Sequence, residues 1–126
     1  MTPRNTRTGS VLEAMILPAL RHGGYSSKVQ QVIGMRFNGG RHVVDGIASK
    51  DSKDYLISLK WQQSGGTAEQ KVPYEVICLA EAVLTGRYAK AYLVLGGEGW
   101  TLRHWYTSGA LSAHLVNAEK VEILTL

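Results

Sequence analysis

Asp45, Ser58 and Lys60 are polar residues set in stretches of sequence that otherwise have the pattern of buried strands. Asp45 stands between Val44 and Gly46, although aspartate is a poor strand former. Because residues two apart on a strand share a face, Ser58 and Lys60 point the same way, and Asp45 lies near both if the two strands pair. A carboxylate can hold a hard cation such as Mg²⁺. A lysine beside it can orient a water molecule or offset charge that develops on a phosphate.

The elements that must position these residues follow from the hydrophobic pattern. Ser10-x-x-Glu13 has the form of a capping box and predicts the start of a helix. Pro18 is expected to kink this helix or end it early, and Gly23-Gly24 to stop it. Asn38-Gly39-Gly40 predicts a hairpin turn. Around it, an antiparallel meander of three strands is expected over residues 29–37, 42–49 and 55–61.

The second half of the chain begins with a long helix. Because Pro73 fits only in a first turn, the regular helix is expected from about Lys71, ending at Thr85-Gly86. Residues 90–95 form a continuous apolar strand of the kind buried on both faces. A helix starting at Ser108 and a last strand over 121–126 are expected after it. One apolar stripe of the long helix repeats at helical spacing: Val72, Val76, Leu79, Ala80 and Val83.

This order of elements and these residues resemble the PD-(D/E)XK nuclease superfamily. The resemblance implies an α/β fold with a restriction-endonuclease-like α-β-β-β-α-β core, in which helices flank a central mixed sheet, plus a C-terminal α-β extension. The family has an Asp on its second strand, an acidic-x-Lys motif on its third and often a Glu on its first helix. Asp45, Lys60 and Glu13 fall on those positions. The resemblance covers roughly residues 8–96, and residues 1–126 are expected to form a single nuclease-like domain.

The resemblance also implies which residues would form the site. Asp45 would be the central metal ligand, and the backbone carbonyl of Leu59 would be a second. Glu13 would bind the metal directly or through water, and Lys60 would serve the nucleophilic water. The implied cofactor is Mg²⁺, for which Mn²⁺ can substitute.

Two residues depart from the family pattern. Val44 precedes Asp45 where the family has Pro, and Ser58 stands where it has Asp or Glu. The second departure is the serious one, because a hydroxyl is a weaker and neutral ligand. Either the site is impaired or another group replaces the carboxylate. The candidates to replace it are Gln62, Glu69, Glu75 and Glu13.

Other polar residues are candidates for the site or for DNA contacts. Gln70-x-x-x-Tyr74 lies at the start of the long helix, where some members of the superfamily carry such an element near the active site. Gln70 can also be interpreted as a simple helix cap, just as Glu13 can as part of a capping box. A basic hairpin tip can contact phosphates or enter a groove. The candidates for these DNA contacts are Arg36, Arg41 and His42 beside the turn, and Arg4, Arg7, Lys28, Lys71 and Arg103 elsewhere.

The composition sets further limits. Fourteen Lys and Arg face ten Asp and Glu, so the formal net charge is +4, which is compatible with nucleic acid and argues against a strongly cationic ligand. The lone Cys78 excludes an internal disulfide, is expected to be a buried hydrophobe, and suits a reducing cytoplasm, bacterial or phage-infected. No uncharged apolar run reaches 18 residues, so no membrane span is expected. Walker A, zinc-ligand and Gly-x-Ser-x-Gly patterns are absent from the sequence.

The expected function is a Mg²⁺-dependent endodeoxyribonuclease acting on double-stranded DNA, of homing, restriction or phage type; a nuclease like the Holliday-junction resolvases is the alternative within the same activity. A domain of this size carries one active site, so cutting both strands would need a homodimer or homotetramer. Two alternatives stay open. The chain could be a non-catalytic DNA-binding module on the same fold, with Ser58 marking lost catalysis, or an α/β interaction protein in which the motif is a coincidence.

Overall fold

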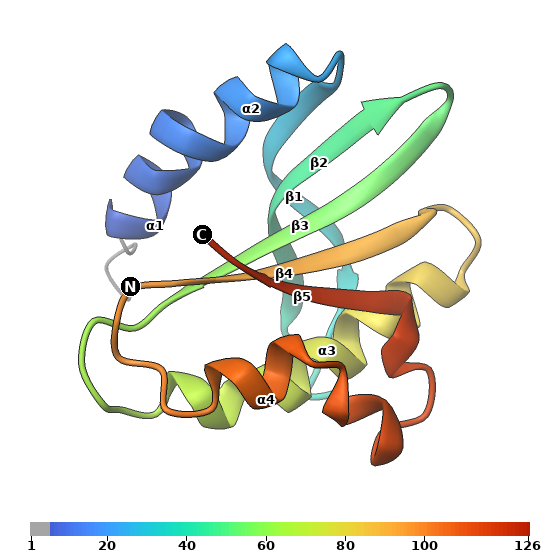
Figure 1. Ribbon diagram of the computed structural model, residues 1–126. Helices are drawn as coiled ribbons and strands as arrows, with labels where there is room; N and C mark the ends of the chain where they lie inside the picture. Colours follow the sequence, from blue (N-terminus) through green and yellow to red (C-terminus); the bar gives the residue numbers. More distant parts are fainter. Residues whose placement is uncertain (1–5) are drawn as a thin grey trace.

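The computed structural model describes residues 6–126, whose helices pack on both faces of a five-stranded mixed sheet (Figure 1). The first three strands form the expected antiparallel meander, and each later strand adds parallel to its neighbour. The predicted α/β class and the order α-β-β-β-α-β, then α-β, are confirmed. In sheet order the strands are β1 (Ser26–Met35), β2 (Arg41–Lys50), β3 (Lys53–Trp61), β4 (Lys90–Gly96) and β5 (Val121–Thr125).

The N-terminal helix differs from expectation in its start and its course. It consists of α1 (Thr6–Val11), a π-helical turn (Leu12–Ile16) and α2 (Leu17–His22). Ser10 lies inside α1, so the predicted capping box is wrong. Pro18 does not end the helix, because the wider π turn precedes it and the Leu17 N–H bonds the carbonyl of Leu12. A π turn makes room where a proline ring would otherwise meet the carbonyl four residues earlier.

The long helix α3 (Ala68–Leu84) starts three residues before the expected position, so Pro73 lies inside it. Proline has no N–H to donate to the carbonyl of Glu69 four residues earlier. The hydroxyl of Tyr106 donates to that carbonyl instead, at 2.7 Å. Burial, followed by the nearby charge of Glu69, raises the pKa of Tyr106, so its hydroxyl stays protonated as a donor at neutral pH.

Tyr106→Phe is expected to lower the free energy of unfolding by about 1–3 kcal/mol, because the buried Glu69 carbonyl would lose its donor. Urea denaturation measures this difference. Tyr88→Phe, at a half-buried tyrosine elsewhere, serves as the matched control and should change stability by less than about 0.5 kcal/mol. Equal stability of Tyr106→Phe and the wild-type protein would show that Pro73 needs no substitute donor.

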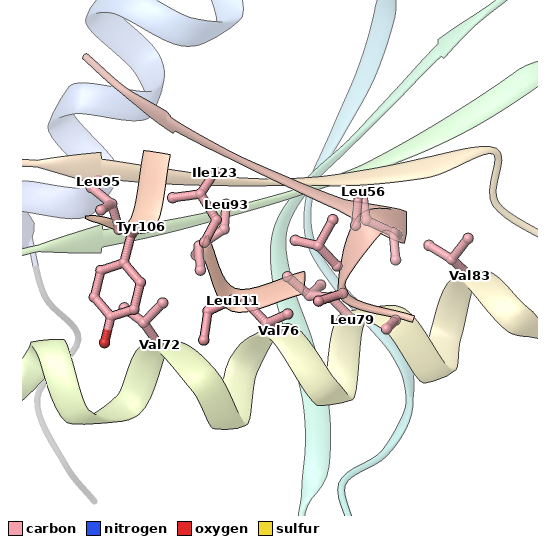
Figure 2. Close-up of a cluster of buried hydrophobic side chains, with 14 of the residues drawn as sticks. Leu56, Val72, Val76, Leu79, Val83, Leu93, Leu95, Tyr106, Leu111 and Ile123 are labelled. Atoms are coloured by element: carbon pink, nitrogen blue, oxygen red, sulfur yellow. The ribbon is translucent and has the colours of Figure 1, made fainter. Parts of the chain in front are cut away.

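The main core lies between the sheet and α3 (Figure 2). The predicted apolar stripe of α3 faces Leu56, Leu93 and Leu95 of the sheet, and Cys78 is buried as expected. The short helix α4 (Arg103–Thr107) and two 3-10 turns cover the same face. The helix expected from Ser108 is wrong, because left-handed residues at 109 and 117 interrupt the chain there. A smaller core under α1 and α2 on the opposite face comprises Val11, Ala48, Ile57, Leu59 and Val94.

Across residues 6–126, none of the helices combines the length and the apolar character needed to cross a membrane.

Candidate functional site

The sheet opens between β2 and β3 at Asp45. These strands pair from the turn only as far as Gly46 and Ile57, and beyond that point β3 continues beside β4 alone. At the branch, Oδ2 of Asp45 accepts a hydrogen bond from the N–H of Leu59 at 2.7 Å. The Asp45 side chain thus takes the place of the backbone acceptor that β2 no longer offers. Because the N–H and C=O of a strand residue face the same edge, the Leu59 carbonyl also faces this opening.

The neighbouring strand β1 is distorted at the same level. Gln30 stands opposite Asp45, between the Val29–Gly46 and Gln31–Val44 pairs, and its φ of +53° is left-handed. Such a conformation inside a strand costs on the order of 1 kcal/mol for a residue with a side chain. The Gln31 side-chain amide donates to the Val29 carbonyl at 2.9 Å beside it. Strain of this kind gathers at functional sites.

A cleft of about 320 Å³ occupies the opening. It brings together four of the predicted catalytic and metal-binding residues, because Asp45, Ser58, Leu59 and Lys60 all line it. Two of the predicted DNA contacts, Arg36 and Lys71, line it as well. Three cationic side chains face one carboxylate, so the cleft favours an anion such as a phosphate. Sequence reasoning missed Gln30, whose only signal is a pair of glutamines inside an apolar strand. The polar and charged lining residues are Thr8, Gln30, Arg36, Asp45, Ser58, Lys60 and Lys71.

Beside the cleft lies a buried carboxylate, Glu75 of α3, whose side chain is 3% exposed. His42 Nε2 lies 2.9 Å from its Oε1, and Arg36 Nη1 lies 2.9 Å from its Oε2. Lys60 Nζ lies 3.8 Å from the same Oε2. We call these four residues the Glu75 cluster. Through Glu75, the cluster links two cations of the cleft to α3: Arg36 of the β1–β2 turn and Lys60 of β3.

The charge state of Glu75 follows from its neighbours. Burial alone would raise the pKa of this carboxyl group, but the hydrogen bond from His42 and the charges of Lys60 and Arg36 outweigh it. The net effect lowers the pKa of Glu75 below its ordinary value. Glu75 is therefore an anion at neutral pH, and His42, being buried against it, is not at the surface as its predicted DNA contact requires.

Glu13 is not brought to the cleft. It is exposed in the π turn, and the N-terminal helix presents Thr8, Gly9 and Leu12 to the cleft instead. Leu12 and Glu13 are consecutive, and neighbours on a helix point in different directions. The predicted role of Glu13 as a metal ligand therefore lacks support in the geometry.

Gln62 and Glu69 also lie away from the cleft lining, in a buried network that holds the start of α3. Gln62 donates to the Gly99 carbonyl at 2.7 Å and to Glu69 at 3.3 Å, and it accepts from the N–H of Ala68 at 3.0 Å. Glu69 accepts from the N–H and the hydroxyl of Thr101. The hydrogen bond from the Thr101 backbone has the largest effect on the pKa of Glu69. Together with the other bonds it outweighs burial and lowers that pKa. The network therefore holds the loop after β4, through Gly99 and Thr101, against the start of α3. Its two side chains do not reach the cleft.

The other predicted residues divide between the surface and the interior. Gln70 is exposed in the first turn of α3, outside the cleft lining, while Tyr74 contacts Arg36. Lys28 and Arg41 are exposed, and Arg103 donates to the Gly97 carbonyl at 2.6 Å. Arg4 and the side chain of Arg7 lie outside the described residues.

The oxygen donors of the cleft suit a hard cation, but the protein offers few of them. Within residues 6–126, no group of three or more His, Cys, Asp or Glu side chains is placed to hold a metal ion. Asp45 offers an anionic oxygen, and Leu59 offers a carbonyl at the open strand edge. Mg²⁺ keeps several waters and is commonly held by one or two carboxylates together with substrate phosphates. The two donors therefore fit such an ion once a phosphate shares the cleft.

Comparisons with known proteins bear on the family and the fold of the chain. The family model described as "PD-(D/E)XK nuclease superfamily domain" matches residues 4–126. Among solved structures, the chain matches one titled "Crystal Structure of Protein of Unknown Function AF1548" with a TM-score of 0.53 and 13% identity. The match covers 88% of this chain and 54% of that one, so this chain spans about half the length of that protein. At this identity the likeness shows the fold alone. A search of curated proteins finds no match.

Proposed function

The chain belongs to the PD-(D/E)XK nuclease superfamily, and from this premise we propose that it is a metal-dependent DNA endonuclease acting at the Asp45 cleft. Members of the superfamily are generally hydrolytic nucleases that use divalent metals. The observation that carries the proposal is the joint placement of Asp45, Leu59 and Lys60 in one cationic cleft where β2 and β3 separate. Double-stranded DNA as substrate, homo-oligomeric assembly and a cytoplasmic location remain predictions.

Asp45 and the Leu59 carbonyl would hold the metal, and Mg²⁺ is the ion that their hard oxygen atoms favour. When bound, this ion supplies Lewis-acid polarisation of the phosphate and a more acidic water. Arg36 and Lys71, which both line the cleft, would bind the non-bridging phosphate oxygens. Together these residues would fix a phosphodiester against Asp45 without any base contact.

Lys60 would act on the attacking water or on the charge that develops on the phosphate. Its side chain is 28% exposed and lines the cleft. Its Nζ also lies 3.8 Å from Oε2 of the buried Glu75, which keeps the ammonium in place. Ser58 lines the same cleft with a neutral hydroxyl and would contribute a hydrogen bond rather than charge.

Glu75 is the one of the four candidate replacements that lies beside Lys60. Its carboxylate oxygens already contact Arg36 and His42, and it does not line the cleft. We therefore assign Glu75 as a positioning residue that orients Lys60 and Arg36, and not as a metal ligand. On this assignment no second carboxylate replaces the acidic residue of the family motif, and Asp45 and the Leu59 carbonyl would hold the ion together with the substrate phosphate.

The test is cleavage of plasmid DNA with Mg²⁺ or Mn²⁺ by the wild-type protein and by Lys60→Ala. The variant is expected to cleave about 10²-fold more slowly, because general acid–base and electrostatic assistance by one side chain are worth factors of this order. Lys53→Ala, at an exposed lysine of the same strand, is the matched control and should cleave normally. Equal rates for Lys60→Ala and Lys53→Ala would remove Lys60 from the chemistry.

A non-catalytic DNA-binding module is the second candidate, and two observations favour it. Ser58 stands in the place of an acid, and the described residues hold no three-ligand acidic cluster. Such a module would retard DNA on a gel with salt-sensitive affinity but would not cut it under either metal.

A further inference from the structure

The β1–β2 turn lies against α3 (Figure 1). Its Phe37 and Tyr74 of the helix form an aromatic pair close to Arg36, which lines the cleft. Phe37 of the turn packs its ring edge against Tyr74 of α3, with ring centroids 6.4 Å apart and an interplanar angle of 62°. Phe37 is 65% exposed and Tyr74 is 38% exposed. Two rings at the surface thus form one patch, which we call the aromatic pair.

The turn does not need Phe37 for its own stability. Its backbone is closed by bonds from Arg36 N–H to the Gly40 carbonyl at 2.7 Å and from Gly39 N–H to the Arg36 carbonyl at 2.9 Å. The Asn38 side chain adds a bond from the Gly40 N–H at 3.0 Å. A large apolar ring on a turn closed in this way leaves most of its surface in water. The ring therefore leaves apolar surface available to a ligand, close to the cations of the cleft.

Arg36 connects the aromatic pair to the cleft. Its guanidinium lies 6.0 Å from the centre of the Tyr74 ring, pairs with Glu75 at 2.9 Å, and lines the cleft. Lys71, one turn before Tyr74 on α3, lines the cleft as well. A strand whose phosphate is held by Arg36 and Lys71 would therefore leave the cleft past the two rings.

We propose that the aromatic pair is a stacking platform for an unpaired base next to the phosphate bound in the cleft. The proposal rests on the proposed function in taking nucleic acid as the ligand. A base inside a duplex has both faces covered by its neighbours, whereas an unpaired base can stack on an exposed ring. The ligand that fits this arrangement is a single-stranded segment of nucleic acid, with its backbone on the cations and one base on Phe37.

The test measures binding of a fluorescently labelled single-stranded oligonucleotide and of a blunt duplex of the same sequence, by anisotropy in EDTA. Phe37→Ala is expected to weaken single-strand binding by about 5- to 100-fold, which is the range for losing one stacked base. Duplex binding should change by less than about 2-fold. The salt dependence should keep its slope, because the ring carries no charge.

Two further variants separate stacking from general apolar contact. Met35→Ala removes an exposed apolar side chain of the same hairpin, 72% exposed, and should bind the single strand like the wild-type protein. Phe37→Leu keeps an apolar side chain without a π face and should bind nearly as weakly as Phe37→Ala. Wild-type affinity of Phe37→Ala for the single strand, or equal losses for Met35→Ala and Phe37→Ala, would overturn the proposal.

The same proteins assayed for cleavage with Mg²⁺ distinguish this proposal from the proposed function. If the wild-type protein cuts DNA while Phe37→Ala keeps full single-strand affinity, only the stacking platform fails. If nothing is cut while Phe37→Ala selectively loses the single strand, the platform stands and the nuclease activity fails.

Discussion

Cleavage of DNA by the Asp45→Asn variant is expected to be about 10³-fold slower than cleavage by the wild-type protein. Asparagine keeps the shape of the side chain but removes the anionic oxygen donor of the cleft, and metal assistance is worth several kcal/mol of barrier, or about a factor of ten for each 1.36 kcal/mol. An amide oxygen can still accept the Leu59 N–H, so the junction of β2 and β3 should survive. Initial rates of plasmid nicking at saturating Mg²⁺ measure the effect.

DNA binding gives an independent measure of the same variant. Removing a negative charge beside Arg36 and Lys60 makes the cleft more attractive to phosphate, so Asp45→Asn should bind DNA in EDTA at least as tightly as the wild-type protein. Asp51→Asn is the matched control, since Asp51 is exposed in the β2–β3 turn and asparagine tolerates its left-handed φ of +53°. Slow cleavage by Asp51→Asn, together with normal cleavage by Asp45→Asn, would contradict the assignment of Asp45.

Glu75→Gln is expected to destabilise the protein by about 2–4 kcal/mol. Breaking a buried ion pair commonly costs about 3–5 kcal/mol, because the remaining charge is left uncompensated. The lower range applies here because Arg36 and Lys60 are partly exposed and can turn towards water. Glu81→Gln, at an exposed glutamate of the same helix, should change stability by less than about 0.5 kcal/mol. Urea denaturation at neutral pH compares the two variants.

The stability of the wild-type protein should also depend on pH through the charge of Glu75. The pKa of Glu75 is lower in the folded protein than its ordinary value of 4.5. Its contribution to stability is therefore complete above about pH 4.5 and is lost as the pH falls through the folded pKa. The stability difference between the wild-type protein and Glu75→Gln should shrink over that acidic window. A difference that stays constant down through this window would show that the Glu75 cluster does not stabilise the fold by charge.

The elements of the fold were accessible to prediction because their signals are local. Alternation of apolar and polar residues marks β2, and one stripe at helical spacing marks α3, so both were found to within a few residues. The start of α3 was not predictable in the same way. The proline at position 73 is tolerated inside the helix because of a hydroxyl from Tyr106, which is far away in the sequence.

The site was accessible only in part, for a related reason. Asp45 and Lys60 stand out because they are charged residues in strand patterns. The separation of β2 from β3 and the bond from Leu59 to Asp45 depend on tertiary geometry. Glu75 could be proposed as one of four acidic or amide candidates, but its burial against Arg36, His42 and Lys60 follows from contacts with the β1–β2 turn, β2 and β3. The strained backbone of Gln30 leaves no mark in the sequence.

The most direct test of the central claim is the Mg²⁺ dependence of plasmid cleavage by the wild-type protein. Protein freed of metal by EDTA is incubated with supercoiled plasmid at increasing Mg²⁺, and the nicked and linear products are quantified. The Asp45 cleft predicts no product without metal and a rate that rises with Mg²⁺ to a plateau, with Asp45→Asn about 10³-fold slower in parallel. Folded wild-type protein that leaves plasmid intact at every concentration of Mg²⁺ and Mn²⁺, or that cuts equally well in EDTA, would contradict it.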